Sequence, residues 1–262
     1  YQKHDFKNVG AEFQFNAAQP FVTCMALYLV ALILVLISWL IWPEPLRKSA
    51  MGIALVALLL HTGGLLIRIW IQGRPPVTNL YSSAIFTSWG AVGCGLLFER
   101  LHRNGIGASA AAIVGFVSLV IAHGFFGMTD GLDVKGDTME MLQAVLDTNL
   151  WLSTHVVCIT LGYVAMFVAG ILGILYLFRG LLDKNFDKAT ARTIPSMIYG
   201  ITCFAVLFSF VGTMLGGIWA DMSWGRFWGW DPKENGAILI VIWSAIVLHA
   251  RWGGIAKDRG IA

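Results

Sequence analysis

Tryptophans and charged residues gather in one stretch of this sequence, here named the Trp-rich segment (residues 217–234). Four of the eleven tryptophans fall within twelve residues: Trp219, Trp224, Trp228 and Trp230. Aromatic side chains bury a large, flat apolar ligand at small entropic cost. The side chains of Arg226 and Lys233 could donate charge-assisted hydrogen bonds to carboxylates at its edge. An aromatic belt at a membrane surface is the alternative, although belts scatter aromatic residues over many helix ends.

The same segment predicts the start of a helix. Asp231 is suited to cap it, Pro232 takes the first helical position and Glu234 lies in the first turn. A cap is a structural role that remains compatible with ligand binding at the same loop.

Histidine is the second residue type that suggests chemistry, because a neutral imidazole ligates metals. His61 and His249 lie inside apolar runs, where an ionisable residue is costly and usually functional, and His155 begins another such run. A hydrogen bond to a carbonyl of a neighbouring helix is the structural alternative for each. His123 is a reserve candidate. The four cysteines form no CxxC pair, which argues against a zinc site or a thiol-redox pair.

Composition predicts the elements that must position these residues. Of the 262 residues, 57% are hydrophobic and 13% charged, about half the charge of a soluble domain. The charges separate apolar runs of about 20 residues, long enough to cross a bilayer. We therefore expect an all-α, polytopic transmembrane bundle surrounded by lipid, and the scattered basic residues argue against nucleic acid. Seven spans are predicted, at residues 21–42, 50–71, 80–98, 107–126, 153–178, 194–216 and 235–252.

The basic residues predict an orientation in the membrane. Residues 43–49, 99–106, 179–193 and 253–262, with Arg251, hold 11 of the 18 lysines and arginines. This side should therefore be cytoplasmic. A short N-terminal segment (1–20), the acidic segment 127–152 and the Trp-rich segment then lie outside, and residues 21–262 form one membrane domain. The acidic segment is expected to be a solvated loop with a short helix at 138–148, or a docking surface for a basic partner.

At the Trp-rich segment the sequence resembles a known family. The string WGRFWGWDPKENGA (224–237) is similar to the WWD signature of the haem-handling cytochrome c biogenesis superfamily. Its DPKE continuation, with HTGGLLIRIWIQGRPPVTNLYSS (61–83), resembles the CcsA/ResC branch over roughly residues 50–262. The resemblance implies a bacterial plasma-membrane or thylakoid protein that carries haem b as cargo. Such a protein presents haem to the CXXCH motif of apocytochrome c, with synthase (haem lyase) activity expected only together with a CcsB-like membrane partner.

The resemblance also implies roles for particular residues. His155 matches an external axial ligand of the haem iron, and His249 matches a histidine that holds haem within the membrane. The platform residues would be Trp224, Trp228, Trp230 and Asp231, with Arg226 and Arg74 directed to propionates and His61 a candidate second intramembrane ligand. The alternative for Arg74, beside Pro75 and Pro76, is a snorkelling arginine at a rigid turn. Asn79 could then cap the helix that begins after this turn.

In relatives a second external histidine follows, one span downstream of the Trp-rich segment. The sequence stops at Ala262, before that position, so we expect a truncated chain whose native form has one more span. Two other classes remain open. One is a CcmC- or CcmF-type haem-handling protein. The other is a transporter or haem redox subunit, although no inverted repeat is visible.

Overall fold

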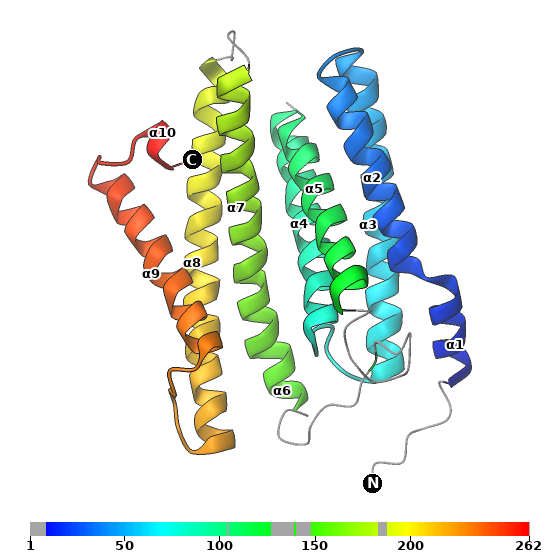
Figure 1. The fold of residues 1–262 in the computed structure, drawn as a ribbon, viewed down its shortest axis with the longest axis vertical. Helices are drawn as coiled ribbons and strands as arrows, with labels where there is room; N and C mark the ends of the chain where they lie inside the picture. Colours follow the sequence, from blue (N-terminus) through cyan, green and yellow to red (C-terminus); the bar gives the residue numbers. More distant parts are fainter. Residues whose placement is uncertain (1–8, 104, 127–138, 140–147, 183–187, 262) are drawn as a thin grey trace.

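The computed structural model describes residues 9–103, 105–126, 139, 148–182 and 188–261, and these form an all-α bundle (Figure 1). Within this part, seven helical stretches are long and apolar enough to cross a membrane, which confirms the predicted fold class. The helices are α1 (Val9–Ala18), α2 (Pro20–Ser38), α3 (Pro43–Gln72), α4 (Leu80–His102), α5 (Ile106–Ile121), α6 (Asn149–Trp151), α7 (Val157–Leu182), α8 (Lys188–Trp224), α9 (Pro232–Trp252) and α10 (Asp258–Ile261).

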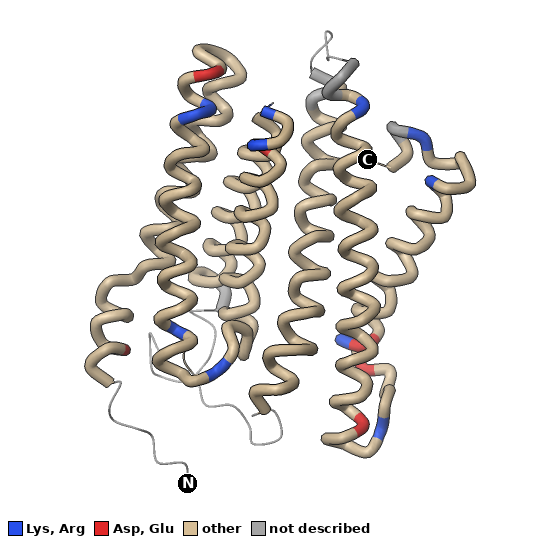
Figure 2. Tube along the Cα trace, turned by 180° about the vertical axis from the view of Figure 1, so that it is seen from behind, with Lys and Arg blue, Asp and Glu red and all other residues tan. Residues whose placement is uncertain are grey.

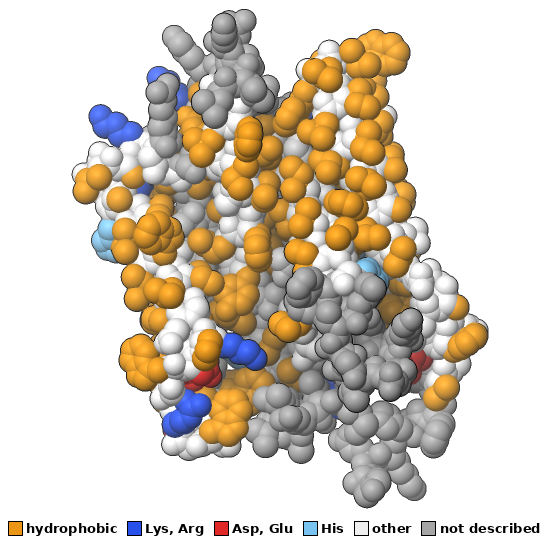
Figure 3. Space-filling model, in the orientation of Figure 1, with side chains coloured by type: hydrophobic (Ala, Val, Ile, Leu, Met, Phe, Trp, Pro, Cys, Tyr) orange, Lys and Arg blue, Asp and Glu red, His pale blue; other side chains and the backbone are white. Residues whose placement is uncertain are grey.

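The helices pack in two groups. Helices α2 to α5 form one group, α7 to α9 form the other, and α4 and α5 join them by packing on α7. Helix α9 packs mainly on α8, and most of its length lies at the periphery of the bundle. Apolar side chains cover much of the described surface seen in Figure 3. Leucines and isoleucines such as Leu59 and Ile174 are exposed. Such a surface suits hydrocarbon rather than water.

Each predicted span coincides with a helix, except that the first, 21–42, runs four residues past the end of α2, and several helices are longer than hydropathy indicated. Residues 43–49 begin α3, and α8 continues to Trp224, so the loop of the Trp-rich segment is only residues 225–231. Helix α1 precedes the first predicted span, and the chain turns between α1 and α2 at Gln19, whose φ is +41°. Pro20 then starts α2. Most of the acidic segment, with its expected helix at 138–148, lies outside the described residues.

Small residues let α4 and α5 approach closely. A Cβ on Gly95 would lie 2.6 Å from Cβ of Ala111, and one on Gly107 would lie 2.7 Å from the carbonyl oxygen of Gly95. Lipid tails are as apolar as leucine, so helices in a membrane associate through such close packing rather than through the hydrophobic effect.

One end of the bundle carries most of the described basic residues and is named the basic end (Figure 2). It comprises the start of α3, the end of α4, the start of α8 and the end of α9, with Arg47, Lys48, Arg100, Arg103, Arg192, Arg251 and Lys257. The buried carboxylate of Glu99 lies there, 3.7 Å from Nε of Arg47, and accepts hydrogen bonds from the amides of Gly105 (3.0 Å) and Ala108 (3.3 Å). The Trp-rich segment lies at the opposite end. The cytoplasmic assignment of the basic end remains a prediction.

The α4–α5 contact predicts a matched pair of substitutions. Gly95→Leu should lower the melting temperature of the purified protein by several degrees, because overpacking a tight contact costs about 1–3 kcal/mol. Gly93→Leu on the same helix should change it little, because a Cβ there meets nothing within 4 Å. Thermal unfolding in detergent measures both. Equal losses in the two variants would contradict the close approach.

Candidate functional site

A cavity of about 430 Å³ lies at the end opposite the basic end. It is enclosed by the connection between α3 and α4, the start of α7, the end of α8, the loop of the Trp-rich segment and the start of α9. Its lining includes Asn79, His155, Thr213, Trp219, Trp224, Phe227, Trp228, Asp231 and Lys233. Three stretches far apart in sequence, 77–83, 152–163 and 213–237, therefore converge on one histidine among aromatic side chains.

His155 is held in a defined tautomer. It lies in a π-helical turn (Leu152–Val156) that joins α6 to α7, and such wide turns often mark functional sites. Its Nδ1 is 2.7 Å from the carbonyl oxygen of Gly212 on α8. A carbonyl only accepts, so Nδ1 carries the proton and Nε2 keeps its lone pair. Within the described part of the chain, Nε2 makes no hydrogen bond. The free Nε2 is therefore able to ligate a metal, and the orientation of the ring is fixed through its other nitrogen.

Glycines on α8 make room for this ring. A Cβ on Gly216 would lie 2.6 Å from Cε1 of His155, and one on Gly217 would lie 2.5 Å from the ring of Phe227. A Cβ on Gly212 would lie 2.8 Å from Cα of Ile159. Sequence reasoning missed these three residues. Their signal was the Gly212-x-x-x-Gly216 spacing, typical of close helix pairs in membranes.

Tryptophans form the walls of the cavity. Trp219 meets the His155 ring edge-on at 5.7 Å and stacks on Trp151, with 6.4 Å between ring centroids and 14° between planes. Trp228 also lines the cavity, and its buried indole Nε1 has no hydrogen-bond partner within the described residues. Trp230 packs edge-on against Trp228 at 6.0 Å but is 73% exposed and does not line the cavity. An unpartnered buried donor costs about 1–3 kcal/mol, so the cavity has an unused site for an acceptor.

The carboxylate of Glu234 fixes the loop between α8 and α9. Its Oε2 accepts from the amides of Gly229 (2.7 Å) and Asp231 (3.3 Å), and its Oε1 lies 3.6 Å from Nη1 of Arg226. Asp231 caps α9 as predicted, accepting from the amides of Lys233 and Glu234. Trp230 has φ of +59°, a costly conformation for a bulky residue, and its carbonyl accepts from the Asn235 side chain at 2.9 Å. The loop is therefore held in a strained shape by first-turn residues of α9.

The two arginines predicted to meet carboxylates do not line the cavity. Arg226 pairs with Glu234, whereas Lys233 reaches the lining. Arg74 is half-buried in the α3–α4 connection, close in sequence to the lining residue Asn79. Asn79 caps α4 by accepting from the Ser82 amide at 2.8 Å, which confirms the predicted cap.

The other histidines lie away from the cavity. His61 is fully buried on α3, where its Nδ1 is 3.2 Å from Oη of Tyr28 and the ring meets Phe21 edge-on. His123 packs against Tyr81 in a π-helical turn at the end of α5. His249 is exposed near the end of α9, with Nδ1 at 2.8 Å from the Ala245 carbonyl oxygen. That bond again leaves Nε2 as the free lone pair.

His155 and His249 cannot share one iron. His249 is 17 residues beyond Pro232 along α9, a rise of roughly 26 Å from the loop that closes the cavity. They therefore define two levels, one at the Trp-rich segment and one toward the basic end.

The fold and cavity define an integral membrane protein whose described residues place one imidazole, that of His155, among tryptophans. Residues 77–261 match the family model of the cytochrome c assembly proteins. Protein NrfI of Wolinella succinogenes is 32% identical over 92% of this chain, which spans 27% of that relative. The cytochrome c biogenesis proteins CcsA of Synechococcus sp. (strain CC9902) and Parasynechococcus marenigrum are each 28% identical. They match 88% and 86% of this chain, over 85% and 81% of their own lengths. The chain belongs to the cytochrome c assembly family, which supports a role in cytochrome c biogenesis.

The interactions of Glu234 predict the behaviour of the loop. Glu234→Ala removes the acceptor of two amides, and losing a hydrogen bond to a charged group costs about 1.5–3 kcal/mol. We expect trypsin to cleave after Arg226 at least about ten-fold faster in this variant. Glu44→Ala, which removes an exposed carboxylate paired with Lys48, is the control and should leave the rate unchanged. Unchanged cleavage in Glu234→Ala would show that other contacts hold the loop.

Proposed function

We propose that this protein presents haem for covalent attachment to apocytochrome c. The observation that carries the proposal is His155, whose Nδ1–H is committed to Gly212 so that Nε2 is the free donor in a tryptophan-lined cavity. A cargo with an iron atom at the centre of a flat apolar ring matches both features. Family membership supports the same cargo, and we take it to be haem b.

The residues of the cavity fit haem at three points. Nε2 of His155 supplies an axial ligand of a type that haem proteins use. Trp219 and Trp224 offer aromatic surface to the macrocycle. The unpartnered Nε1 of Trp228 and the side chain of Lys233 are donors suited to propionates. One histidine lines the cavity among the described residues, so bis-histidine ligation requires an imidazole from elsewhere.

The chain's own contribution is position and electrostatics, because the bond-forming chemistry belongs to the porphyrin and the substrate thiols. Each CXXCH thiol adds across a vinyl group, with sulfur going to one carbon and the proton to the other. The capped loop keeps the tryptophan surface in place for this addition. Lyase activity is proposed only for the complex with a CcsB-like membrane partner.

The exposed side of α9 supports such a partner. His249 is exposed among Trp243, Ile246 and Trp252, and an ionisable group facing lipid alone is costly. A helix of the partner that covers this side would shield His249 and supply a second imidazole for haem on its way to the cavity. In this proposal haem enters at the basic end, taken as cytoplasmic, and leaves at the Trp-rich segment.

The first test is the absorption spectrum of the protein purified from membranes. His155→Gly should lower haem retained in the cavity by roughly ten-fold or more, because an axial bond is lost. Added imidazole should restore the signal, since the shortened side chain leaves space for a free ligand. Haem retention that is indifferent to the substitution would overturn the proposal.

A second variant leaves the imidazole itself in place. Gly216→Ala puts a Cβ 2.6 Å from Cε1 of His155 and should displace the ring, weakening haem binding by about ten-fold. Gly170→Ala on α7 is the control, because its Cβ meets nothing within 4 Å. Equal haem content in both variants would contradict ligation by His155.

The role of His249 predicts a difference between delivery and binding. His249→Gly should lower the amount of haem that the cavity acquires in cells, because haem then lacks an imidazole ligand on its path from the basic end to the cavity. Haem added to the purified variant should bind the cavity as in the unaltered protein, since the two levels are separate. A variant that fails both measurements, as His155→Gly should, would place His249 in the same site.

A further inference from the structure

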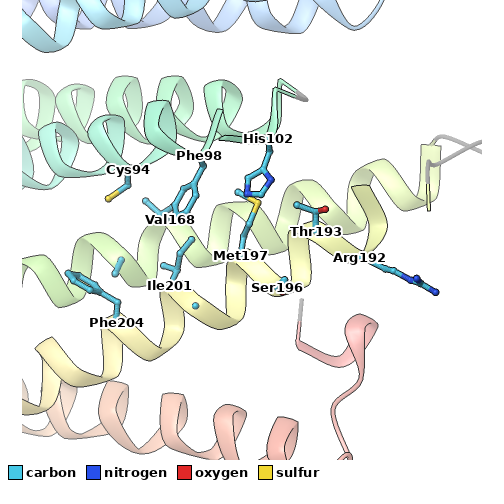
Figure 4. Close-up of a pocket in the computed structure, with 12 residues that line it drawn as sticks. Cys94, Phe98, His102, Val168, Arg192, Thr193, Ser196, Met197, Ile201 and Phe204 are labelled. Carbon is cyan, nitrogen blue, oxygen red and sulfur yellow. The ribbon is translucent and has the colours of Figure 1, made fainter. Parts of the chain in front are cut away.

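A second and larger cavity lies at the basic end, between α4, α7 and α8. Its volume is about 740 Å³, and its walls are mainly apolar, with Phe98, Val168, Met197, Ile201 and Phe204 among the lining residues. Figure 4 shows Phe98 and His102 projecting from α4 toward Val168 and Met197. Helices α4 and α8 each pack on α7, which forms the floor of the groove between them.

The groove has the depth of one leaflet. Its lining on α8 runs from Arg192 to Phe204, a rise of roughly 18 Å over twelve residues. Half of the hydrocarbon core of a bilayer is about 15 Å thick. The candidate membrane span of α8 begins at Ala191, so Arg192 lies at its outer end and Phe204 lies deeper within it. The length of the groove therefore matches one leaflet.

The mouth of the groove is polar and cationic, whereas the interior is not. His102, Arg192 and Ser196 line the outer end. Neither His102 nor Arg192 makes a hydrogen bond or ion pair within the described part of the chain, and Figure 4 shows the Arg192 side chain extending outward from α8. Arg100 and Arg103 add positive charge at the same end.

We propose that this groove binds one acyl chain of an anionic phospholipid, with the headgroup at Arg192 and His102. An apolar slot one leaflet deep matches an acyl chain in length, and a guanidinium at its mouth that makes no ion pair with the described residues matches a phosphate in charge. The site is separate from the tryptophan-lined cavity, which lies at the other end of the bundle. The groove lies between α4 and α8, so the lipid adds to the contact between the two helix groups.

Gly200 offers a substitution that fills the groove. It lines the cavity, and a Cβ built on it meets no atom within 4 Å, so Gly200→Leu occupies the space without a clash. The probe is phosphatidylglycerol with a photoreactive acyl chain, in vesicles that also contain phosphatidylcholine, with labelled peptides found by mass spectrometry. We expect labelling of peptides from 94–102 and 192–204, falling at least about five-fold in Gly200→Leu. Gly52→Leu, an exposed position on α3 with equally open space, is the control and should label like the unaltered protein.

The headgroup is tested with the matching phosphatidylcholine probe. The unaltered protein should prefer phosphatidylglycerol by about five-fold, the contribution of one basic residue at a membrane surface, and Arg192→Gln should abolish this preference. Arg100→Gln, at the same end but outside the lining, should retain it. Labelling that ignores Gly200→Leu, or equal labelling by both lipids, overturns the proposal. Haem content that falls in Gly200→Leu while labelling persists assigns the groove to haem instead. These outcomes leave the His155 tests unaffected.

Discussion

The hydrogen bond between Nδ1 of His155 and the carbonyl oxygen of Gly212 is the interaction on which the candidate site depends. It connects the π-helical turn that leads into α7 with α8, so the direction of the imidazole is set by the packing of two membrane helices. Those helices approach closely along their length. Gly162 faces Ser209, Gly212 faces Ile159 and Gly216 faces His155, each at a distance that excludes a larger side chain. In a membrane, close packing at small residues drives the association of helices, whereas in water the burial of apolar surface drives it. The same glycines therefore stabilise the bundle and set the direction of the imidazole.

The loop above the imidazole depends on a second local constraint. The chain must reverse between α8 and α9 within residues 225–231, and it does so with positive φ at Gly225 and Trp230. A bulky residue in that region persists only where its surroundings fix it. Glu234 does this through two amides and Arg226, and Asn235 through the Trp230 carbonyl. The charged residues of the Trp-rich segment thus hold the tryptophans in place, and the loop is continuous with the start of α9.

Hydropathy and capping rules predicted much of this architecture. Each predicted span coincides largely with a helix, and Asn79 and Asp231 cap as their side chains indicate, because both signals are local in sequence. The rest depends on contacts between distant segments. Gly216–Gly217 resembles a helix end in sequence, yet α8 continues to Trp224 because those glycines receive the rings of His155 and Phe227. Arg226 was expected to face a ligand, and only the folded loop brings Glu234 within 3.6 Å of it. The distribution of basic residues predicts the orientation of the protein in the membrane, and the geometry of the bundle does not test this prediction.

The separation of the two free imidazoles constrains how any cargo is handled. Each ring donates Nδ1–H to a backbone carbonyl, which leaves the Nε2 lone pair available, but one ring lies among tryptophans and the other is exposed on α9. A rise of roughly 26 Å along α9 lies between the loop and His249. No rigid arrangement lets both rings bind one iron, so a cargo that uses both must leave the first before it reaches the second. Helix α9 is the element that connects them. Its sparse contacts with the bundle leave one side open along that whole distance, and this is the side on which transfer and a membrane partner would meet.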